Sequence, residues 1–436
     1  MAYLLNTEKQ VKEMLEAINL KDMKELYSYL PQELIIESLE IPHALGEIDV
    51  LRQFEAWGAA NKVFPSIFRG AGSYRHYIPA VVPEMANKER FKTAYTPYQA
   101  EVSQGTLQSI FEFQTMICEL TGMDVSNASV YDVASAAGEA ANMCRDRKKQ
   151  RVYITGGVNP RTANTVKTYS WSFNSPVEEL PQNSSGLVDI EAIKNIEHTD
   201  TAAIIIQQPN YFGLIEDVAA ITEAAHSKGI KVIVSVNPIA AAVLPTAGEC
   251  GADVAIGEGQ PLGIPLGFGG PYLGFMSCTK AMMRAIPGRI VGETKDDQGR
   301  RAYVLTLQAR EQHIRRETAG SNLCSNQALC AITAAAYMSS MGSQGMTEVA
   351  MQCYNKAHYL QSELEKIGFA PKYTVDFFHE FVTKCPVDID KLNLHLESKG
   401  ILGGLPLDCG CILWCATEMN TKKDIDALIA ACKEVK

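Results

Sequence analysis

The sequence has no excess of positive charge and no long hydrophobic run. Its 436 residues carry 50 acidic and 40 basic side chains, which gives a formal net charge of −10. Nucleic-acid-binding proteins usually present a basic face, so this balance predicts no nucleic-acid partner. No apolar stretch approaches the length that spans a bilayer, which predicts no membrane partner. The first residues lack a basic segment and carry Glu8, so we expect no secretory signal and a cytoplasmic protein.

Motifs of the Walker, Rossmann and metalloprotease kinds are also absent. The chain has 12 cysteines, and the tightest group is Cys409, Cys411 and Cys415. A zinc site would need a fourth ligand and a C-x-x-C spacing, and neither lies nearby. The sequence therefore predicts no metal, and reduced thiols that pack mostly as small hydrophobic side chains.

Short apolar segments alternate with helical ones through the middle of the chain. A helix over 105–121 is expected to stop at Gly122, and two more are expected over 132–149 and 217–228. The expected strands cover 152–155, 202–207, 231–236 and 253–256. Strands that alternate with helices at this spacing predict an α/β fold, whose parallel-rich sheet is covered on both faces.

The pattern changes at both ends of the chain. Residues 1–69 are expected to form an N-terminal helical arm, because Val11, Met14, Leu15 and Ile18 recur at helical spacing. Residues 70–310 form the predicted large α/β domain, and 311–436 a small C-terminal α+β domain. The arm would bury little by itself, so we expect it to wrap around the body or a partner.

Several unusual runs spread over most of the chain identify its relatives. They are YTPYQ at 95–99, SQG at 103–105, LTGMD at 120–124, GEGQPLGIPL at 257–266, PGR at 287–289, REQHIRR at 310–316 and GGLP at 403–406. On these runs the chain resembles the P-protein (glycine decarboxylase) family of the glycine cleavage system. The match is to subunit 1 of the split two-chain form. The resemblance implies a fold-type I pyridoxal-phosphate (aminotransferase-like) fold.

The positions that hold the cofactor in such folds are altered in this chain. Gln260 and Pro261 stand near the place of the lysine that binds pyridoxal phosphate covalently, and neither has an amine. Asn237 stands where an aspartate normally pairs with the pyridine nitrogen. Asp132 and Val133 stand where a small-residue loop binds the phosphate, and the charge of Asp132 disfavours an anion. We therefore expect no catalytic residue on this chain and pyridoxal 5'-phosphate on a partner.

The resemblance implies a function shared between two subunits. In the family, the cofactor of subunit 2 supplies the electron sink for CO2 loss from glycine, and the aminomethyl group passes to the lipoyl arm of H-protein. The expected partners are therefore subunit 2 of glycine dehydrogenase (decarboxylating), lipoylated H-protein and glycine, in a heteromer of two copies of each chain. One alternative is a non-catalytic scaffold or regulatory paralogue. Another, a self-sufficient lyase that uses Lys280 or Lys295, is disfavoured because both lie outside the glycine-rich loop.

Two segments are candidates for the wall of a shared cleft. The first is rich in hydrogen-bonding side chains, and a loop of this kind reaches a ligand readily. Its tyrosines could equally be half-buried in the core, but the resemblance favours a cleft that faces the partner subunit. The second is the glycine-containing loop over 70–79, where His76 is either a structural residue or part of the cleft wall. The candidates in the first segment are Tyr95, Thr96, Pro97, Tyr98, Gln99, Gln104 and Gly105.

A third candidate is the charged run around Arg310, His313 and Arg315. It could recognise a phosphate or a carboxylate near the cleft. Its charges could instead pair along a solvated helix, which is the interpretation we favour. Thr318 and Gly320 replace the lysine and threonine that are usual in close relatives. The effect on activity of these changes, and of Val133, stays open.

Overall fold

The structure, a computed structural model, describes residues 6–36, 38–93 and 96–435. The chain divides into two compact units, residues 1–63 and 64–436. No helix in the described part of the chain is both long enough and apolar enough to cross a membrane.

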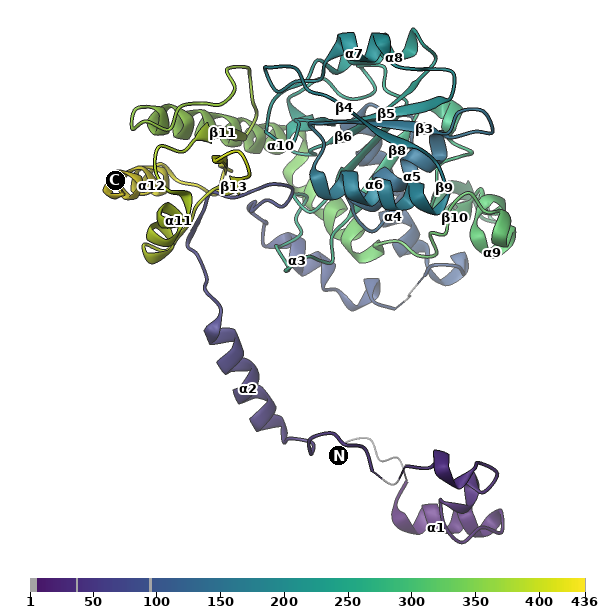
Figure 1. Ribbon diagram of the computed structural model, residues 1–436. Coiled ribbons are helices and arrows are strands. Elements are labelled where there is room, and N and C mark those ends of the chain that lie inside the picture. The colour runs from purple at the N-terminus through teal and green to yellow at the C-terminus, as the bar shows by residue number, and fades with distance from the viewer. Residues whose placement is uncertain (1–5, 37, 94–95, 436) are drawn as a thin grey trace. The chain divides into compact units, whose positions relative to one another are not determined.

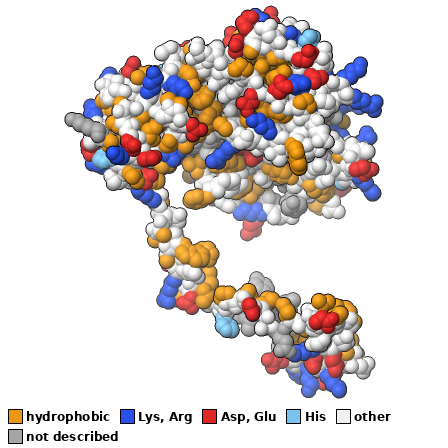
Figure 2. Space-filling view, in the orientation of Figure 1, with side chains coloured by type: hydrophobic (Ala, Val, Ile, Leu, Met, Phe, Trp, Pro, Cys, Tyr) orange, Lys and Arg blue, Asp and Glu red, His pale blue; other side chains and the backbone are white. Residues whose placement is uncertain are grey.

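The first unit is helical and buries very little. It contains α1 (Glu8–Ala17), which begins with a capping box between Thr7 and Gln10, and α2 (Glu47–Ala60). Leu15 is the one buried side chain among its described residues. Helix α2 exposes Ile48, Leu51, Phe54 and Trp57 at helical spacing. Figure 2 shows hydrophobic side chains spread over the surface of this unit. Exposed apolar surface of this extent is typical of a segment that contacts another protein surface.

The second unit is built on a seven-stranded sheet of order β2-β8-β7-β6-β5-β3-β4. The five strands from β7 to β4 are parallel, β8 is antiparallel to β7, and β2 is antiparallel to β8. This sheet confirms the predicted α/β fold. The strands are β2 (Val125–Ser126), β3 (Arg151–Thr155), β4 (Val177–Leu180), β5 (Thr201–Gln208), β6 (Lys231–Val236), β7 (Val254–Glu258) and β8 (Gly274–Cys278).

Helices cover both faces of the sheet, and α7 and α8 lie on the side opposite α5 and α6 (Figure 1). Successive side chains of a strand point to opposite faces, so Ile204 packs with one group of helices and Ile205 with the other. Helices α4 and α10 complete the α7–α8 side. The helices are α4 (Gln104–Thr121), α5 (Val133–Cys144), α6 (Pro160–Ser172), α7 (Ile190–Asn195), α8 (Val218–His226) and α10 (Ala328–Glu365), which is interrupted at Gly342.

The remaining elements lie around this sheet and in the C-terminal part. A three-stranded antiparallel sheet has the order β11-β14-β13 and packs around Trp414. Strand β1 pairs in parallel with β12, and β9 pairs with β10. The elements are α3 (Val81–Ala86), α9 (Gln312–Arg315), α11 (Ile389–Ser398), α12 (Lys422–Glu434), β1 (Ser66–Ile67), β9 (Ile290–Lys295), β10 (Arg301–Thr306), β11 (Glu380–Lys384), β12 (Ile401–Leu402), β13 (Leu405–Leu407) and β14 (Cys411–Cys415).

Local signals predicted the main strands of the parallel sheet and several of its helices. The four expected strands correspond to β3, β5, β6 and β7, and α4 ends at Gly122 in the left-handed conformation (φ 68°). A helix was expected over 132–149, and its predicted C-terminal end was wrong, because α5 stops at Cys144. There the Asp146 carboxylate accepts hydrogen bonds from the backbone N–H groups of Lys148 and Lys149. Such a local bond offers the backbone an alternative to the helix.

Candidate functional site

A small cavity of about 60 Å³ lies at the carboxyl ends of β3, β5, β6 and β7. Open α/β sheets bind their ligands at this edge. The cavity is therefore the place where a cofactor of this fold would be expected. It is lined by Gly72, Tyr74, Val133, Asn159, Thr162, Gln207, Pro209, Ser235, Val236, Asn237, Pro238, Glu258, Pro261, His379 and Glu380.

The end of the cavity next to helix α5 is occupied by carboxylates. Asp132 caps the helix, because its Oδ1 accepts the N–H of Ser135 at 2.7 Å. Glu258, at the end of β7, accepts the N–H of Val133 with Oε2 at 3.2 Å. Burial raises the pKa of Glu258 to about 7, although hydrogen bonds from three backbone N–H groups oppose the shift. A helix N-terminus favours an anion, and here the anion belongs to the chain itself.

The two other altered cofactor positions are also engaged within the chain. The Gln260 side chain is 2% exposed. It accepts the N–H of Tyr74 at 2.9 Å and donates to the carbonyls of Tyr74 and Ile264. Asn237 accepts the N–H groups of Ile239 and Ala240. Gln260 therefore ties the glycine-rich loop to the 70–79 loop, while Asn237 caps a turn of backbone.

These residues do not fit pyridoxal phosphate. No lysine or arginine occurs among the described residues that line the cavity, and the side chains of Lys280 and Lys295 are exposed outside it. The volume of about 60 Å³ is well below the roughly 300–1,000 Å³ of ordinary ligand pockets. The helix end that would hold a phosphate already faces the carboxylates of Asp132 and Glu258.

The cavity is also lined by the buried carboxylate of Glu380. Glu380 accepts the N–H of Ala71 at 2.6 Å and the hydroxyl of Tyr74 at 2.7 Å. Burial raises the pKa of Glu380 to about 7, and these two hydrogen bonds oppose the shift. His379 lies beside Tyr74, with ring centroids 4.7 Å apart. Burial lowers the pKa of His379 to about 3, so its imidazole is neutral at physiological pH.

Glu380 should make the stability of this chain depend on pH. Its folded pKa of about 7 lies above the usual 4.5, so the folded state is favoured below pH 4.5 and loses this advantage as pH rises towards 7. A shift of this size corresponds to about 3 kcal/mol. In urea unfolding, the stability of the wild type relative to Glu380→Gln should fall by about that amount between pH 4.5 and pH 8. Glu179→Gln, at an exposed position, is the control and should show no such change; an equal change would contradict the assignment.

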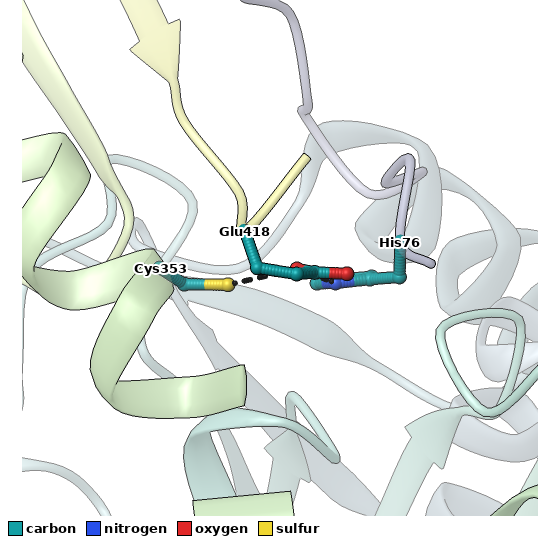
Figure 3. Close-up of side chains that lie close together, drawn as sticks. All are labelled: His76, Cys353 and Glu418. Carbon is teal, nitrogen blue, oxygen red and sulfur yellow. Dashed lines mark hydrogen bonds and ion pairs between the residues drawn. The ribbon is translucent and has the colours of Figure 1, made fainter. Parts of the chain in front are cut away.

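The structure places His76 inside the chain rather than on an open cleft wall. Its side chain is 2% exposed, and Nδ1 lies 2.7 Å from Oε2 of Glu418. The Cys353 thiol donates to the same carboxylate at 3.3 Å, so the three side chains form one buried cluster (Figure 3). Two atoms bound tetrahedrally to zinc at 2.0–2.1 Å lie about 3.3 Å apart. The 2.7 Å between His76 Nδ1 and Glu418 Oε2 is shorter than this. It is the distance of a hydrogen bond and not of two ligands on one zinc ion.

The loop over 96–105 presents Tyr98 at the surface. Its side chain is 55% exposed, and its Oη accepts a hydrogen bond from Arg289 at 2.6 Å. The guanidinium carbon of Arg289 also lies 5.0 Å from the centre of the Tyr98 ring. Arg289 itself is buried, with its Nε 3.9 Å from Oε2 of Glu311. The buried guanidinium of Arg289 therefore contacts both the hydroxyl and the ring of Tyr98.

The other predicted residues of this loop differ in their environment. Tyr95 lies outside the described residues. Thr96 is partly buried and Pro97 is buried, whereas Gln99 and Gly105 are exposed. The Gln104 side chain donates to the carbonyls of Ala100 and Tyr303 and accepts the N–H of Tyr303. Gln104 therefore anchors the loop to strand β10.

The predicted anion patch is only partly free to bind. Arg310 donates to the carbonyls of Ile286 and Gly288, and the Nε of Arg315 donates to the carbonyl of Ala309 at 3.2 Å. His313 is exposed, and its ring centre lies 6.3 Å from that of Tyr98. The structure thus brings the Tyr98 loop and the charged run together, and both were candidates for the neighbourhood of the shared cleft.

Arg289 is the residue that joins them, and sequence reasoning assigned it no role. It occurs in the run PGR, which carried the family resemblance. Its partner Tyr98 lies 191 residues away along the chain, so no local pattern could pair them. Its place in the PGR run was the one sequence feature that could have drawn attention to Arg289.

Comparison with solved structures first defines the class of fold. A sphingosine-1-phosphate lyase from Burkholderia pseudomallei aligns with a TM-score of 0.68 at 14% identity, over 93% of this chain and 94% of its own. A structure described as a C-DES mutant with glycine covalently linked to its pyridoxal-phosphate cofactor aligns at 0.63 and 15% identity, over 88% and 99%. The fold is that of the fold-type I pyridoxal-phosphate enzymes, as predicted.

Closer relatives then define the family. The family model of the glycine cleavage system P-protein matches residues 1–432. A probable glycine dehydrogenase (decarboxylating) subunit 1 from Brevibacillus brevis is 45% identical, over 99% of this chain and 98% of its own length. A protein of the same description from Desulfitobacterium hafniense is 44% identical, over the full length of both.

A crystal structure of glycine decarboxylase (P-protein) in inhibitor-bound form is 36% identical and aligns over the full length of both chains, with a TM-score of 0.93. This chain belongs to the glycine cleavage system P-protein family, and the resemblance drawn from the sequence is confirmed.

Proposed function

We propose that this chain is the cofactor-free subunit of a two-chain glycine dehydrogenase (decarboxylating). It acts with a second, lysine-bearing subunit that carries pyridoxal phosphate. The observation that supports this proposal is the cavity at the carboxyl ends of the parallel strands, which the chain's own side chains fill. Relatives described as subunit 1 match the chain over almost its full length, which agrees with a division of roles between two chains.

The reaction that this pair performs is the decarboxylation of glycine, followed by transfer of the aminomethyl group to the lipoyl arm of H-protein. The cofactor on the partner supplies the electron sink for CO2 loss. This chain completes the cleft from its own side, with the 96–105 loop facing the partner. The exposed His313 places a polar group next to that loop, where it suits the carboxylate of glycine or the phosphate of the cofactor.

Tyr98 is the residue of this chain best placed to touch the reacting groups. Arg289 donates an N–H to its Oη, so the hydroxyl hydrogen of Tyr98 is not used in that bond and points elsewhere. This leaves it free to donate to an acceptor presented by the partner or the substrate. The Arg289 guanidinium, which also contacts the ring, fixes the side chain before the ligand arrives and so lowers the cost of ordering it.

Reconstitution tests the proposal directly. This chain and the lysine-bearing subunit from the same organism are purified separately, and glycine-dependent CO2 release is measured with H-protein for each alone and for the mixture. Activity is expected from the mixture only. Activity of this chain alone would support the self-sufficient lyase, and full activity of the partner alone would support the scaffold.

The isolated chain should not react covalently with pyridoxal phosphate. Gln260 and Pro261 offer no amine, and the exposed Lys280 and Lys295 lie outside the cavity. Mixing the two should therefore give no visible absorbance band beyond that of the free aldehyde. Borohydride treatment followed by peptide mass spectrometry should fix no stoichiometric label. A label on one lysine of this chain at a ratio near one would overturn the prediction.

A further inference from the structure

The N-terminal end of helix α5 is filled by a carboxylate from another part of the same chain. Oε2 of Glu258 accepts the N–H of Val133 at 3.2 Å. Oε1 accepts the N–H groups of Gln260 at 3.1 Å and of Leu273 at 2.9 Å. Val133 belongs to the first turn of α5, whereas Gln260 lies in the glycine-rich loop and Leu273 directly precedes β8. Converging backbone N–H groups with a helix N-terminus among them are what phosphate-binding sites use. In this chain all three donors already have an acceptor.

We propose that Glu258 is a built-in substitute for a bound phosphate, and that it keeps phosphorylated ligands, including pyridoxal phosphate, out of this chain. A phosphate could reach these N–H groups only by displacing the carboxylate. That would leave Glu258 without its three donors in a largely buried place, at the cost of an unsatisfied charged group. Asp132 adds like charge at the same helix end.

The surrounding side chains support this assignment. The described lining of the cavity offers no lysine or arginine to balance a second anion, and it includes the carboxylate of Glu380. In an assembly of two related folds, this arrangement would direct the cofactor to the chain that keeps the helix end open. Glu258 is then a residue that determines where the cofactor binds. This role rests on the proposed division of the two chains, but its test uses the isolated chain and needs no activity.

The test removes the carboxylate and asks whether a free anion takes its place. The probe is inorganic phosphate, and the readout is the thermal unfolding midpoint of the purified full chain at pH 7.5. Glu258→Ala should unfold at a lower temperature than the wild type and regain roughly 2 °C or more between 0 and 50 mM phosphate, at constant ionic strength. The wild type should show no such gain.

A matched control is Glu216→Ala. Glu216 is a buried glutamate that accepts the backbone N–H of Val188 at 3.0 Å and the side-chain amide of Asn210 at 2.7 Å, and neither donor belongs to the first turn of a helix. Its variant should lose stability without regaining it in phosphate. If Glu258→Ala does not fold, Glu258→Ser replaces it in the test, because the serine hydroxyl keeps one hydrogen-bond acceptor at this position. No phosphate-dependent gain in the Glu258 variant, or an equal gain in the wild type or in Glu216→Ala, would overturn the proposal.

Discussion

Replacing Tyr98 with alanine is expected to lower the rate of glycine decarboxylation by the assembled complex roughly 100-fold, which is the size of effect seen when one well-placed hydrogen-bond donor is removed from an active site. The side chain is more than half exposed, and its hydroxyl hydrogen is not used in the bond with Arg289, which donates to the Tyr98 oxygen. Assembly should survive, since one tyrosine contributes little to a large obligate interface. Size-exclusion chromatography of the complex and initial rates of CO2 release measure the two effects.

Two further variants separate the hydroxyl from the ring. Tyr98→Phe removes only the hydroxyl, and a comparable loss of rate would identify it as the active group. Tyr359→Ala is a matched control, because Tyr359 also has a cation over its ring, Lys422 at 5.0 Å, and a hydrogen bond to Asp426. Tyr359 lies on α10 and faces α12, away from the loop. Full activity of a correctly assembled Tyr98→Ala complex would reassign the loop to a structural role.

Loss of Arg289 should produce the largest destabilisation among the residues of this site. Arg289 and Glu311 are both buried and lie 3.9 Å apart. Arg289→Met leaves the buried Glu311 carboxylate without its guanidinium partner and with only the His313 ring, whose Nδ1 lies 3.6 Å from the same Oε2. Removing one partner of a buried pair typically costs about 3–5 kcal/mol. Urea unfolding of the purified chain measures the effect.

A double-mutant cycle shows whether the pair accounts for that cost. Glu311→Gln removes the charge that Arg289→Met leaves behind, so the double variant should be more stable than Arg289→Met alone. Equal stability of the two would mean that Arg289 acts through its packing against Tyr98 and not through Glu311. Arg289→Met should also lower the activity of the complex, because Tyr98 loses its support.

Sequence patterns predicted the parts of this structure that depend on neighbours in the chain. The strands of the parallel sheet and the end of α4 at Gly122 follow from local composition and backbone chemistry. That Gln260 and Pro261 offer no amine for the cofactor could be read from the glycine-rich loop alone, once the loop was matched to the family. The family was reached in the same way, through runs of adjacent residues.

The parts that sequence reasoning missed depend on contacts between distant residues. Tyr98 and Arg289 are 191 residues apart, and His76 and Glu418 are 342 apart. The reversal of β8, antiparallel to β7, also has no local signal. Glu258 stood inside the most informative run of the sequence, yet its role depends on the position of α5, which begins 125 residues earlier. Only the folded chain brings such groups together.

The first unit has a consequence for how the cell must make this protein. Its described residues bury one side chain, Leu15, and leave Phe54 and Trp57 more than half exposed. If the partner subunit covers this surface, a copy synthesised in excess of its partner would present exposed apolar side chains to chaperones and proteases, which continuously sort such species. The steady-state amount of this protein would then follow the supply of its partner.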